Sequence, residues 1–317
     1  MLRIGLIGCG AHCIEAHAPA LIDFAERHPA TIALAAACDL DHTRAEDFVR
    51  RYGFAAAYTD VGEMLAAERL DGALSIMPVD RIVDTSLYLF ECGMPCIIEK
   101  PLATTIADLD RLRTAARSAA APHQVSLNRR FMPMAIKALA WCRDRGPVVK
   151  VNGRILRHRR TEKAFIWSTG IHVVDMCCHI VGEIASYHIR RLEAPSLESN
   201  WYDITLNFPG GAQGHIEMMP TAGWREETYE ILGDGYRVLL SDSHLQAWED
   251  GVPAIDERVP EAMPVHERDG SLGELAAFVA ALGNGSMLHP TVDDAYGAMR
   301  CCLEMAAETG VLHAGPE

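Results

Sequence analysis

Met1-Leu-Arg-Ile-Gly-Leu-Ile-Gly-Cys-Gly-Ala-His-Cys13 is a short apolar run followed by a glycine-rich turn. Residues 2–7 are typical of a buried strand in a parallel sheet. A helix-like stretch begins at Ile14, directly after the turn. A strand, a glycine turn and a helix together predict a dinucleotide-binding unit, in which the turn admits a pyrophosphate and the helix N-terminus attracts its charge.

The residues of the turn itself are the first candidates for cofactor contacts. They are Gly8, Cys9, Gly10, Ala11, His12 and Cys13. Cys13 stands where the third glycine of the fingerprint is expected, at a position that governs helix–strand packing and accepts a small thiol. A glycine turn also occurs in proteins that bind no nucleotide, and the glycines alone leave that alternative open.

The residue after the second apolar run points to the kind of nucleotide. Residues 31–38 (TIALAAAC) predict another buried strand, and Asp39 follows it. An acid at that end binds the ribose hydroxyls. Asp41 adds negative charge that would repel a 2′-phosphate, so NAD is favoured over NADP. The alternative for Asp39 is an N-cap of the helix expected over residues 43–52.

The separation of Gly10 from Asp39 is unusually long, so the first helix or its exit loop must be long. Pro19 is expected to break or kink that helix.

Two further strands are predicted over residues 72–77 and 95–98. The first is closed by Pro78, a candidate cofactor contact, and the second runs into Glu99-Lys100-Pro101. Ligands of doubly wound sheets bind beyond the carboxyl ends of the strands. Lys100 at such an end is suited to stabilise an alkoxide beside a nicotinamide. An ion pair with Glu99 is an equally good interpretation.

Length and charge limit the possible partners. The chain has 317 residues, enough for two domains, and a net charge of −14, which argues against nucleic acid and anionic membranes as partners. It contains no apolar run of about 18 residues, the length that a transmembrane helix needs. Its ten cysteines form no CxxC pair. With a strand so near the N-terminus, they are interpreted as reduced thiols of a cytoplasmic protein.

The second half of the sequence changes character. Strands are predicted over residues 148–156, 186–192, 201–208, 213–219, 228–232 and 236–241, with hairpin turns at 209–211 and 233–235. Helices are expected before them, at 105–120 and 133–145, and after them, at 273–282 and 291–309. A short strand over 125–128 resumes the first sheet.

The fold prediction is therefore α/β: an N-terminal Rossmann domain with a doubly wound parallel sheet, residues 1–124, and a C-terminal α+β domain, residues 125–317. The second domain is expected to be built on an open, mainly antiparallel sheet. A C-terminal helix that packs back on the first domain is an open option.

A polar stripe marks one helix in the second half, predicted over residues 168–179. At 100° per residue, Ser168, His172, Asp175 and His179 fall within a narrow arc. His172 is the natural acid–base candidate, and Asp175 is placed to orient it. One alternative is a metal site of His172, Asp175 and His179, which no strong ligand spacing supports. Another is a pair of satisfied interface histidines.

Several stretches in this order resemble the Gfo/Idh/MocA oxidoreductase family. They are the glycine turn, Glu99-Lys-Pro-Leu-Ala103, Ser126-Leu-Asn-Arg-Arg-Phe131, the segment around His172 and Asp175, and Thr291-Val-Asp-Asp-Ala295. The resemblance covers essentially the whole chain. It implies a Rossmann domain, an open mixed sheet that forms homodimers or homotetramers, and NAD(P)-linked redox chemistry on sugars, cyclitols or related polyols.

Carried over, the resemblance assigns Lys100 to the reacting oxygen and His172 to general acid–base catalysis. In the oxidising direction His172 would accept the hydroxyl proton while hydride leaves for the nicotinamide. The family usually has an aspartate four residues before this histidine, but Ser168 stands there, and the usual glycine pair before it is also absent. The substrate half therefore departs from the family pattern.

Trp167, Ser168, Arg129 and Arg157 are further candidates for substrate contacts. Arg157 and its basic neighbours up to Arg160 are suited to a carboxylate or phosphate if the small-molecule substrate is anionic. The alternative is a solvated loop or a subunit contact. No resident metal is expected.

Two other functions remain open. One is a redox-neutral enzyme that uses tightly bound NAD for transient oxidation, as the resemblance to glycosidases of the family implies. The other is a non-catalytic NAD-binding sensor, against which Lys100 and His172 count and for which Ser168 counts.

Overall fold

The computed structural model describes residues 1–194 and 199–309, which divide into two compact units. Among the described residues, the first unit comprises 1–128 together with 271–296, and the second comprises 129–194, 199–270 and 297–309. The expected domain boundary after residue 124 thus falls inside strand β6 (His123–Val125). The segment 271–296 belongs to the first unit, whereas the sequence assigned it to the second.

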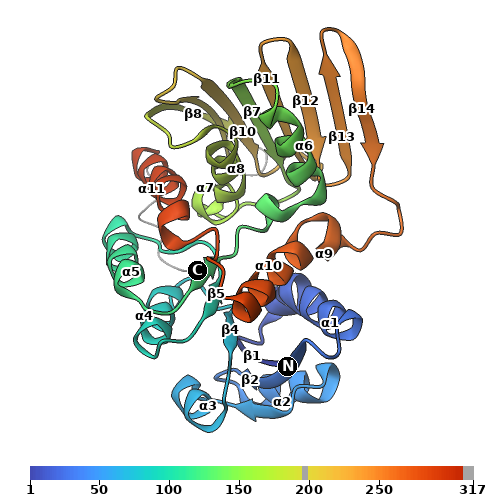
Figure 1. Ribbon diagram of the computed structural model, residues 1–317. Helices are drawn as coiled ribbons and strands as arrows, with labels where there is room; N and C mark the ends of the chain where they lie inside the picture. The colour runs from blue at the N-terminus through green and yellow to red at the C-terminus, as the bar shows by residue number, and fades with distance from the viewer. Residues whose placement is uncertain (195–198, 310–317) are drawn as a thin grey trace. The chain divides into compact units, whose positions relative to one another are not determined.

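The first unit contains a six-stranded, entirely parallel sheet in the order β3-β2-β1-β4-β5-β6 (Figure 1). Its other strands are β1 (Leu2–Ile7), β2 (Ile32–Cys38), β3 (Ala56–Tyr58), β4 (Gly72–Ser75) and β5 (Cys96–Ile98). This is the strand order of dinucleotide-binding folds, in which the order reverses beside β1 and leaves a crevice at the carboxyl ends. The predicted Rossmann fold is confirmed.

Helices connect these strands in sequence order. They are α1 (Ala18–Arg27), α2 (His42–Tyr52), α3 (Val61–Ala67), α4 (Ile82–Glu91) and α5 (Ile106–Ser118), with α10 (Ser271–Asn284) returning late in the chain. A π-helical turn, η1 (Cys13–His17), precedes α1. Pro19 lies in the first turn of α1, where its missing N–H removes no bond. Pro19 thus lies at the start of α1 and does not interrupt it, and the irregular part of this segment is the π turn before α1.

One local prediction in this unit is wrong, and one alternative is excluded. The segment 125–128 does not resume a strand, because β6 ends at Val125 and a 3₁₀ turn, η2 (Asn128–Phe131), follows. The N-cap of α2 is Asp41, whose side chain accepts a hydrogen bond from the Thr43 N–H, so Asp39 is not the cap.

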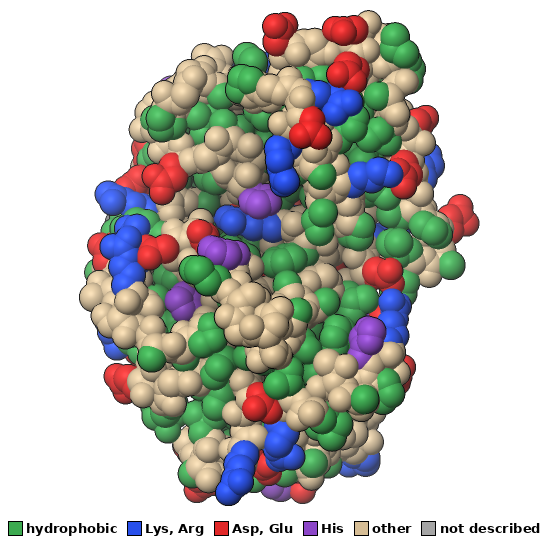
Figure 2. Space-filling view, in the orientation of Figure 1, with side chains coloured by type: hydrophobic (Ala, Val, Ile, Leu, Met, Phe, Trp, Pro, Cys, Tyr) green, Lys and Arg blue, Asp and Glu red, His purple; other side chains and the backbone are tan. Residues whose placement is uncertain are grey.

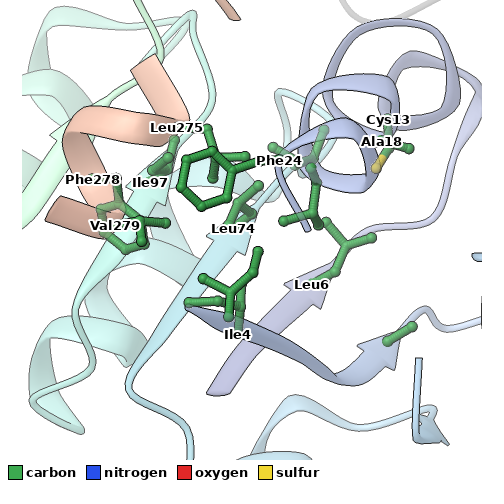
Figure 3. Packing of buried hydrophobic residues seen from close by; sticks show 14 of the residues in the cluster. Ile4, Leu6, Cys13, Ala18, Phe24, Leu74, Ile97, Leu275, Phe278 and Val279 are labelled. Carbon is green, nitrogen blue, oxygen red and sulfur yellow. The ribbon is translucent and has the colours of Figure 1, made fainter. Parts of the chain in front are cut away.

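Helix α10 completes the hydrophobic core of the first unit (Figure 3). Leu275, Phe278 and Val279 pack in one buried cluster with Ile4 of β1 and Phe24 of α1. The sheet has a glycine where α10 crosses it, since a Cβ on Gly72 would lie 2.9 Å from the Phe278 ring. The parallel sheet is thus covered by a helix that comes from the far end of the sequence.

The second unit is built on an eight-stranded sheet in the order β14-β13-β12-β11-β7-β10-β9-β8. Its strands are β7 (Val148–Leu156), β8 (Ser186–Ala194), β9 (Ser199–Asn207), β10 (Gln213–Met219), β11 (Glu226–Gly233), β12 (Tyr236–Ser241), β13 (His244–Glu249) and β14 (Val252–Arg258). Only β7 and β10 pair in parallel within the described sheet. The mixed, mainly antiparallel sheet is confirmed.

The sequence reading missed the hairpin of β13 and β14. Its turn is Asp250-Gly251, with φ angles of 50° and 79°. An Asp-Gly pair with both residues at positive φ is the sequence that two-residue hairpins prefer, so the signal for these strands was present in the chain.

The helices of the second unit are short. They are α6 (Pro133–Arg143), α7 (Phe165–Ser168), α8 (Ile171–Val181) and α9 (Val265–Arg268). Helix α11 (Val292–Glu308) begins in the first unit and continues in the second. No described helix combines the length and apolar character needed to cross a bilayer.

The negative net charge is not gathered in one patch on the face that Figure 2 displays, where acidic and basic side chains are interspersed. Asp293, for example, binds both Arg113 and Arg117. Ion pairs of this kind neutralise acidic side chains locally.

We expect Phe278→Ala to destabilise the first unit by about 3–5 kcal/mol, because it empties a fully buried position that nothing nearby can fill. Denaturant unfolding followed by circular dichroism measures the effect. Met287→Ala is the control, since Met287 is highly exposed in the same unit and its loss should cost less than about 0.5 kcal/mol. Equal effects of the two variants would contradict the place given to α10.

Candidate functional site

The glycine turn after β1 has the geometry that a dinucleotide needs. Gly8 has a φ of 92°, and a Cβ there would lie 2.2 Å from the carbonyl oxygen of Ile76. Gly10 faces open space, because a Cβ on it would meet nothing within 4 Å. Gly8 is therefore required by the fold, whereas Gly10 leaves room for a ligand to approach the backbone.

Asp39 ties the end of β2 to this turn. Its Oδ2 accepts a hydrogen bond of 2.8 Å from the Cys9 N–H, and its Oδ1 accepts from the Asp41 N–H at 2.9 Å. The guanidinium of Arg44 also donates to Oδ1, at 3.0 Å. Sequence reasoning missed Arg44, which follows Asp39 by five residues on α2.

A pocket of about 580 Å³ opens at the carboxyl ends of β1, β2 and β4. Gly8, Asp39, Arg44 and Pro78 line it. Its volume lies in the range of small-molecule sites, and it occupies the switch point where doubly wound sheets bind ligands. Gly8 and Asp39, two of the residues expected to contact the dinucleotide, line this pocket, and its chemistry is compatible with part of a nicotinamide dinucleotide.

The cysteines of the turn serve packing. Burial raises the pKa of the Cys9 thiol to about 12, with a smaller contribution from the Asp39 carboxylate. Burial likewise raises the pKa of Cys13, which is 1% exposed. Both thiols are protonated at neutral pH, and Cys13 fills the position of the third glycine as a small apolar group.

Lys100 follows β5 and is paired with a buried carboxylate. Its Nζ lies 3.8 Å from Oε1 of Glu99. The Glu99 carboxylate also lies 2.7 Å from His17 Nε2 and 3.4 Å from His12 Nε2. Burial alone would raise the pKa of Glu99, but His17, His12 and Lys100 outweigh it and hold that pKa well below its usual range. Glu99 is therefore a charged group that fixes three cationic or polar side chains around it.

The helix predicted over residues 168–179 is wrong at its start. Ser168 ends α7, and α8 begins at Ile171, so Ser168 and His172 do not share one helix. The break lies at Gly170, where a Cβ would be 2.4 Å from the Ile166 carbonyl oxygen and 2.6 Å from the Met218 sulfur. His172, Asp175 and His179 do lie on α8.

Asp175 binds an arginine. Its two carboxylate oxygens accept hydrogen bonds of 2.9 and 2.6 Å from the Nε and Nη2 of Arg130. Asp175 is almost fully buried, and His179 at the end of α8 is exposed. Asp175, the carboxylate expected to orient His172, is thus bound to Arg130 of the 126–131 stretch. Because Arg130 occupies both oxygens, this geometry does not support the alternative metal site of His172, Asp175 and His179.

A second buried carboxylate, Glu227 of β11, lies near His172. It accepts hydrogen bonds from Arg129 at 3.0 and 3.2 Å, from Arg157 at 2.8 Å and from the Tyr229 hydroxyl at 2.8 Å. Burial raises the pKa of Glu227, but Arg129, His172 and Arg157 outweigh this and hold it well below its ordinary value. No local motif marks Glu227, so the sequence reading did not find it.

These contacts decide what the two arginines can do. Arg157 also donates to the backbone carbonyl oxygens of Leu156 and Glu226. The guanidinium groups of Arg157 and Arg129 therefore bind groups of the protein itself, above all the Glu227 carboxylate, rather than standing ready for an anionic substrate. Arg160, at the other end of the basic segment, donates to the Thr169 hydroxyl at 3.2 Å.

A pocket of about 450 Å³ lies over this carboxylate in the second unit. Arg129, Arg157 and Glu227 line it together with Trp224 and Arg225. Trp224 is 67% exposed and adds a large apolar surface to the rim of a polar pocket. Trp167, the tryptophan expected to contact substrate, lies in α7 and does not line this pocket.

A family model described as an oxidoreductase family with an NAD-binding Rossmann fold, GFO_IDH_MocA, matches residues 2–127. Over these residues the chain is similar to the Gfo/Idh/MocA oxidoreductase family. The cofactor expectation is confirmed at this level, because NAD binding is the property by which the family's Rossmann fold is described.

Two characterised relatives are dehydrogenases. D-apiose dehydrogenase of Paraburkholderia graminis is 29% identical over 196 residues, which span 56% of this chain and 49% of that enzyme. Inositol 2-dehydrogenase of Corynebacterium glutamicum strain R is 23% identical over 273 residues, 81% of this chain and 79% of that enzyme. The first match thus spans only about half the length of the relative.

Solved structures share the fold over nearly the whole chain. A dehydrogenase from Chromobacterium violaceum has a TM-score of 0.86 at 19% identity, covering 98% of this chain and 95% of its own. A levoglucosan dehydrogenase in complex with NADH has a TM-score of 0.85 at 19% identity, covering 97% of each chain. At these identities the likeness establishes the architecture of both units.

We expect Asp39→Asn to shift the ratio of NADPH to NADH affinity by about tenfold toward NADPH. The change keeps an acceptor for the Cys9 N–H but removes the charge that neutralises Arg44, which then attracts a 2′-phosphate. Fluorescence titration with each nucleotide measures the ratio. Asp47→Asn is the control, since Asp47 pairs with Arg50 on the exposed side of the same helix. An unchanged ratio in Asp39→Asn would exclude this role for the pair.

We expect Glu227→Gln to cost about 3 kcal/mol at pH 7, because it leaves two arginines against a neutral buried group. Since the folded pKa of Glu227 is depressed, its contribution is fully present above the unfolded pKa of about 4.3 and is lost as pH falls through the folded value. Thermal unfolding from about pH 5 down to about pH 2 enters that window and should therefore show a shallower acid loss in the variant.

Glu249→Gln is the matched control for this pH series. Glu249 pairs with Arg145 in the same unit but is 45% exposed at its side chain, so its loss should cost less than about 1 kcal/mol. Parallel pH curves for the wild type and Glu227→Gln would show that Glu227 is not held ionised by its neighbours.

Proposed function

We propose that this protein is an NAD-dependent dehydrogenase that transfers hydride between the nicotinamide and a hydroxyl-bearing carbon of a sugar, cyclitol or related polyol. The observation that carries the proposal is Lys100, an amine at the carboxyl end of β5 in the same unit as the dinucleotide turn and beside an ionised Glu99. The two dehydrogenase relatives, which by name act on apiose and inositol, support the substrate class.

The chemistry divides between the cofactor and two side chains. Bound NAD supplies the hydride acceptor. Lys100 stabilises the negative charge that develops on the substrate oxygen, and His172 accepts the hydroxyl proton at its imidazole. Glu227 contributes at a distance, since its carboxylate favours the positive charge that His172 acquires. A buried anion is thereby supplied although Ser168 occupies the place of the usual aspartate.

The substrate group that the second unit binds is neutral. Arg129 and Arg157 are both held by Glu227, so neither has a guanidinium edge reserved for a carboxylate or phosphate. Arg225 is exposed at the pocket rim and would have to bind any anionic group. A panel of polyols and aldoses beside the matching sugar acids, followed at the NADH absorbance, separates the two possibilities.

We expect Lys100→Met and His172→Gln each to lower kcat by about 10²- to 10⁴-fold while NADH still binds. Stopped-flow turnover and NADH fluorescence titration measure the two quantities separately. Lys137→Met is the control, because Lys137 makes an exposed ion pair with Glu257. Near-normal turnover of Lys100→Met on the true substrate would refute its assignment. A structure with NADH and substrate should place both side chains within hydrogen-bond distance of one oxygen.

Two further outcomes would replace the proposal. Co-purified NAD with substrate turnover but no net NADH formation indicates a redox-neutral enzyme, and tight NAD binding with no turnover across the panel indicates a sensor. Ser168→Asp tests whether the serine sets substrate choice, since gained activity on common polyols would show that it does.

The assembly belongs to the same proposal. We propose a cytoplasmic homodimer or homotetramer that associates through the eight-stranded sheet of the second unit. Light scattering on the eluting protein measures the mass of the assembly.

A further inference from the structure

The π turn before α1 brings two histidines together. η1 runs from Cys13 to His17, with His12 directly before it. Hydrogen bonds from residue i to i+5 stack side chains five positions apart, which an α-helix would rotate to different faces. The His12 and His17 rings accordingly lie 5.6 Å apart, centroid to centroid. Single π turns occur often at functional sites.

A third ligand comes from another element. Glu99, at the end of β5, places one carboxylate oxygen 2.7 Å from His17 Nε2 and the other 3.4 Å from His12 Nε2. One donor atom of each residue lies within 4.8 Å of the others. In the described ranges, 1–194 and 199–309, this is the one group of three or more His, Cys, Asp or Glu side chains with that spacing.

We propose that His12, His17 and Glu99 form a binding site for a divalent transition-metal ion of the Zn²⁺ type. Two imidazole nitrogens and one carboxylate oxygen are a zinc ligand set, and they leave a fourth position open. Metal–ligand bonds of 2.0–2.1 Å in a tetrahedron separate ligand atoms by roughly 3.3 Å. His12 Nε2 already has this spacing from Oε1 of Glu99. His17 Nε2 lies 2.7 Å from the other oxygen, Oε2, so the carboxylate or the His17 ring has to turn before one oxygen serves with both nitrogens.

The site is accessible and selective. His12 is 55% exposed at its side chain, whereas Glu99 is 4% exposed, so an ion can reach a ligand that the interior holds rigid. Two nitrogen donors favour Zn²⁺, Ni²⁺ or Cu²⁺ over Mg²⁺ and Ca²⁺, which prefer oxygen. The spacing His-x₄-His would place the two side chains on different faces of an α-helix, so the sequence pattern alone does not indicate this pair.

Binding has a defined proton balance. His17 Nε2 donates a hydrogen to the ionised Glu99 carboxylate in the metal-free protein, and this proton must leave Nε2 when the ion binds. A neutral imidazole moves it to Nδ1, and an imidazolium releases it to solvent. The ion also displaces Lys100, whose Nζ lies 3.8 Å from Glu99 Oε1. Affinity should therefore fall as the pH is lowered, because protons compete with the ion for the imidazole nitrogens.

The test is titration of the full chain, stripped of nucleotide, with Zn²⁺ by isothermal calorimetry. The titration uses a Cys92→Ser background, because Cys92 is exposed and a thiolate is itself a zinc ligand. We expect one equivalent to bind, and His12→Ala to weaken binding by at least about tenfold. His42→Ala is the control: His42 is an exposed histidine 3.7 Å from Glu46 with no third ligand, and its loss should change nothing.

A second readout does not depend on affinity. Co²⁺ in place of Zn²⁺ should give the visible absorption bands of a four- or five-coordinate ion, and Glu99→Gln should abolish them. Because Glu99 is buried, its variant is first checked by thermal unfolding, and His12→Ala carries the test if Glu99→Gln is unfolded. Absence of a bound equivalent, or binding that survives His12→Ala unchanged, would overturn the proposal. Neither result depends on turnover, so the redox proposal is tested apart from it.

Discussion

The close approach of the backbone at Gly8 to the Ile76 carbonyl is the constraint on which the first unit depends. A side chain at Gly8 would overlap that oxygen at 2.2 Å, so β1 and the segment after β4 can meet only at a glycine. This contact fixes where β1 ends, and the turn that follows is held by the Asp39 carboxylate through the Cys9 N–H. The crevice at the strand ends, and with it the nucleotide pocket, follows from this one backbone contact.

Both units use a buried carboxylate to organise polar side chains. Glu99 is surrounded by His17, His12 and Lys100, and Glu227 by Arg129 and Arg157. A buried anion is tolerated only with such partners, because an unpaired charge in the interior costs several kcal/mol, on the order of 3–5. The partners are in turn held in place, so these clusters position the side chains to which we assign chemistry. The contacts that compensate the charges of Glu99 and Glu227 thus also fix the positions of the side chains at the proposed sites.

The sequence predicted what short-range patterns encode. Apolar runs and glycines gave the strands around Gly8, and Lys100 was found because it follows a strand directly. The prediction failed where distant residues decide. Position 170, between α7 and α8, accepts only a glycine because Met218 and the Ile166 carbonyl leave no space for a Cβ, and no pattern near Gly170 reveals Met218. Glu227 has no motif of its own, and its role appears only when Arg129 and Arg157 meet it.

The return of α10 to the first unit has a consequence for synthesis of the chain. Phe278 and its neighbours fill the interior over β1 and β4, so residues 1–128 emerge from the ribosome with that apolar surface uncovered. The unit becomes complete only after Asn284 has been made, when all of the second sheet has already been translated. The nascent nucleotide-binding half must therefore wait for nearly the whole polypeptide, a period in which this apolar surface is exposed to aggregation.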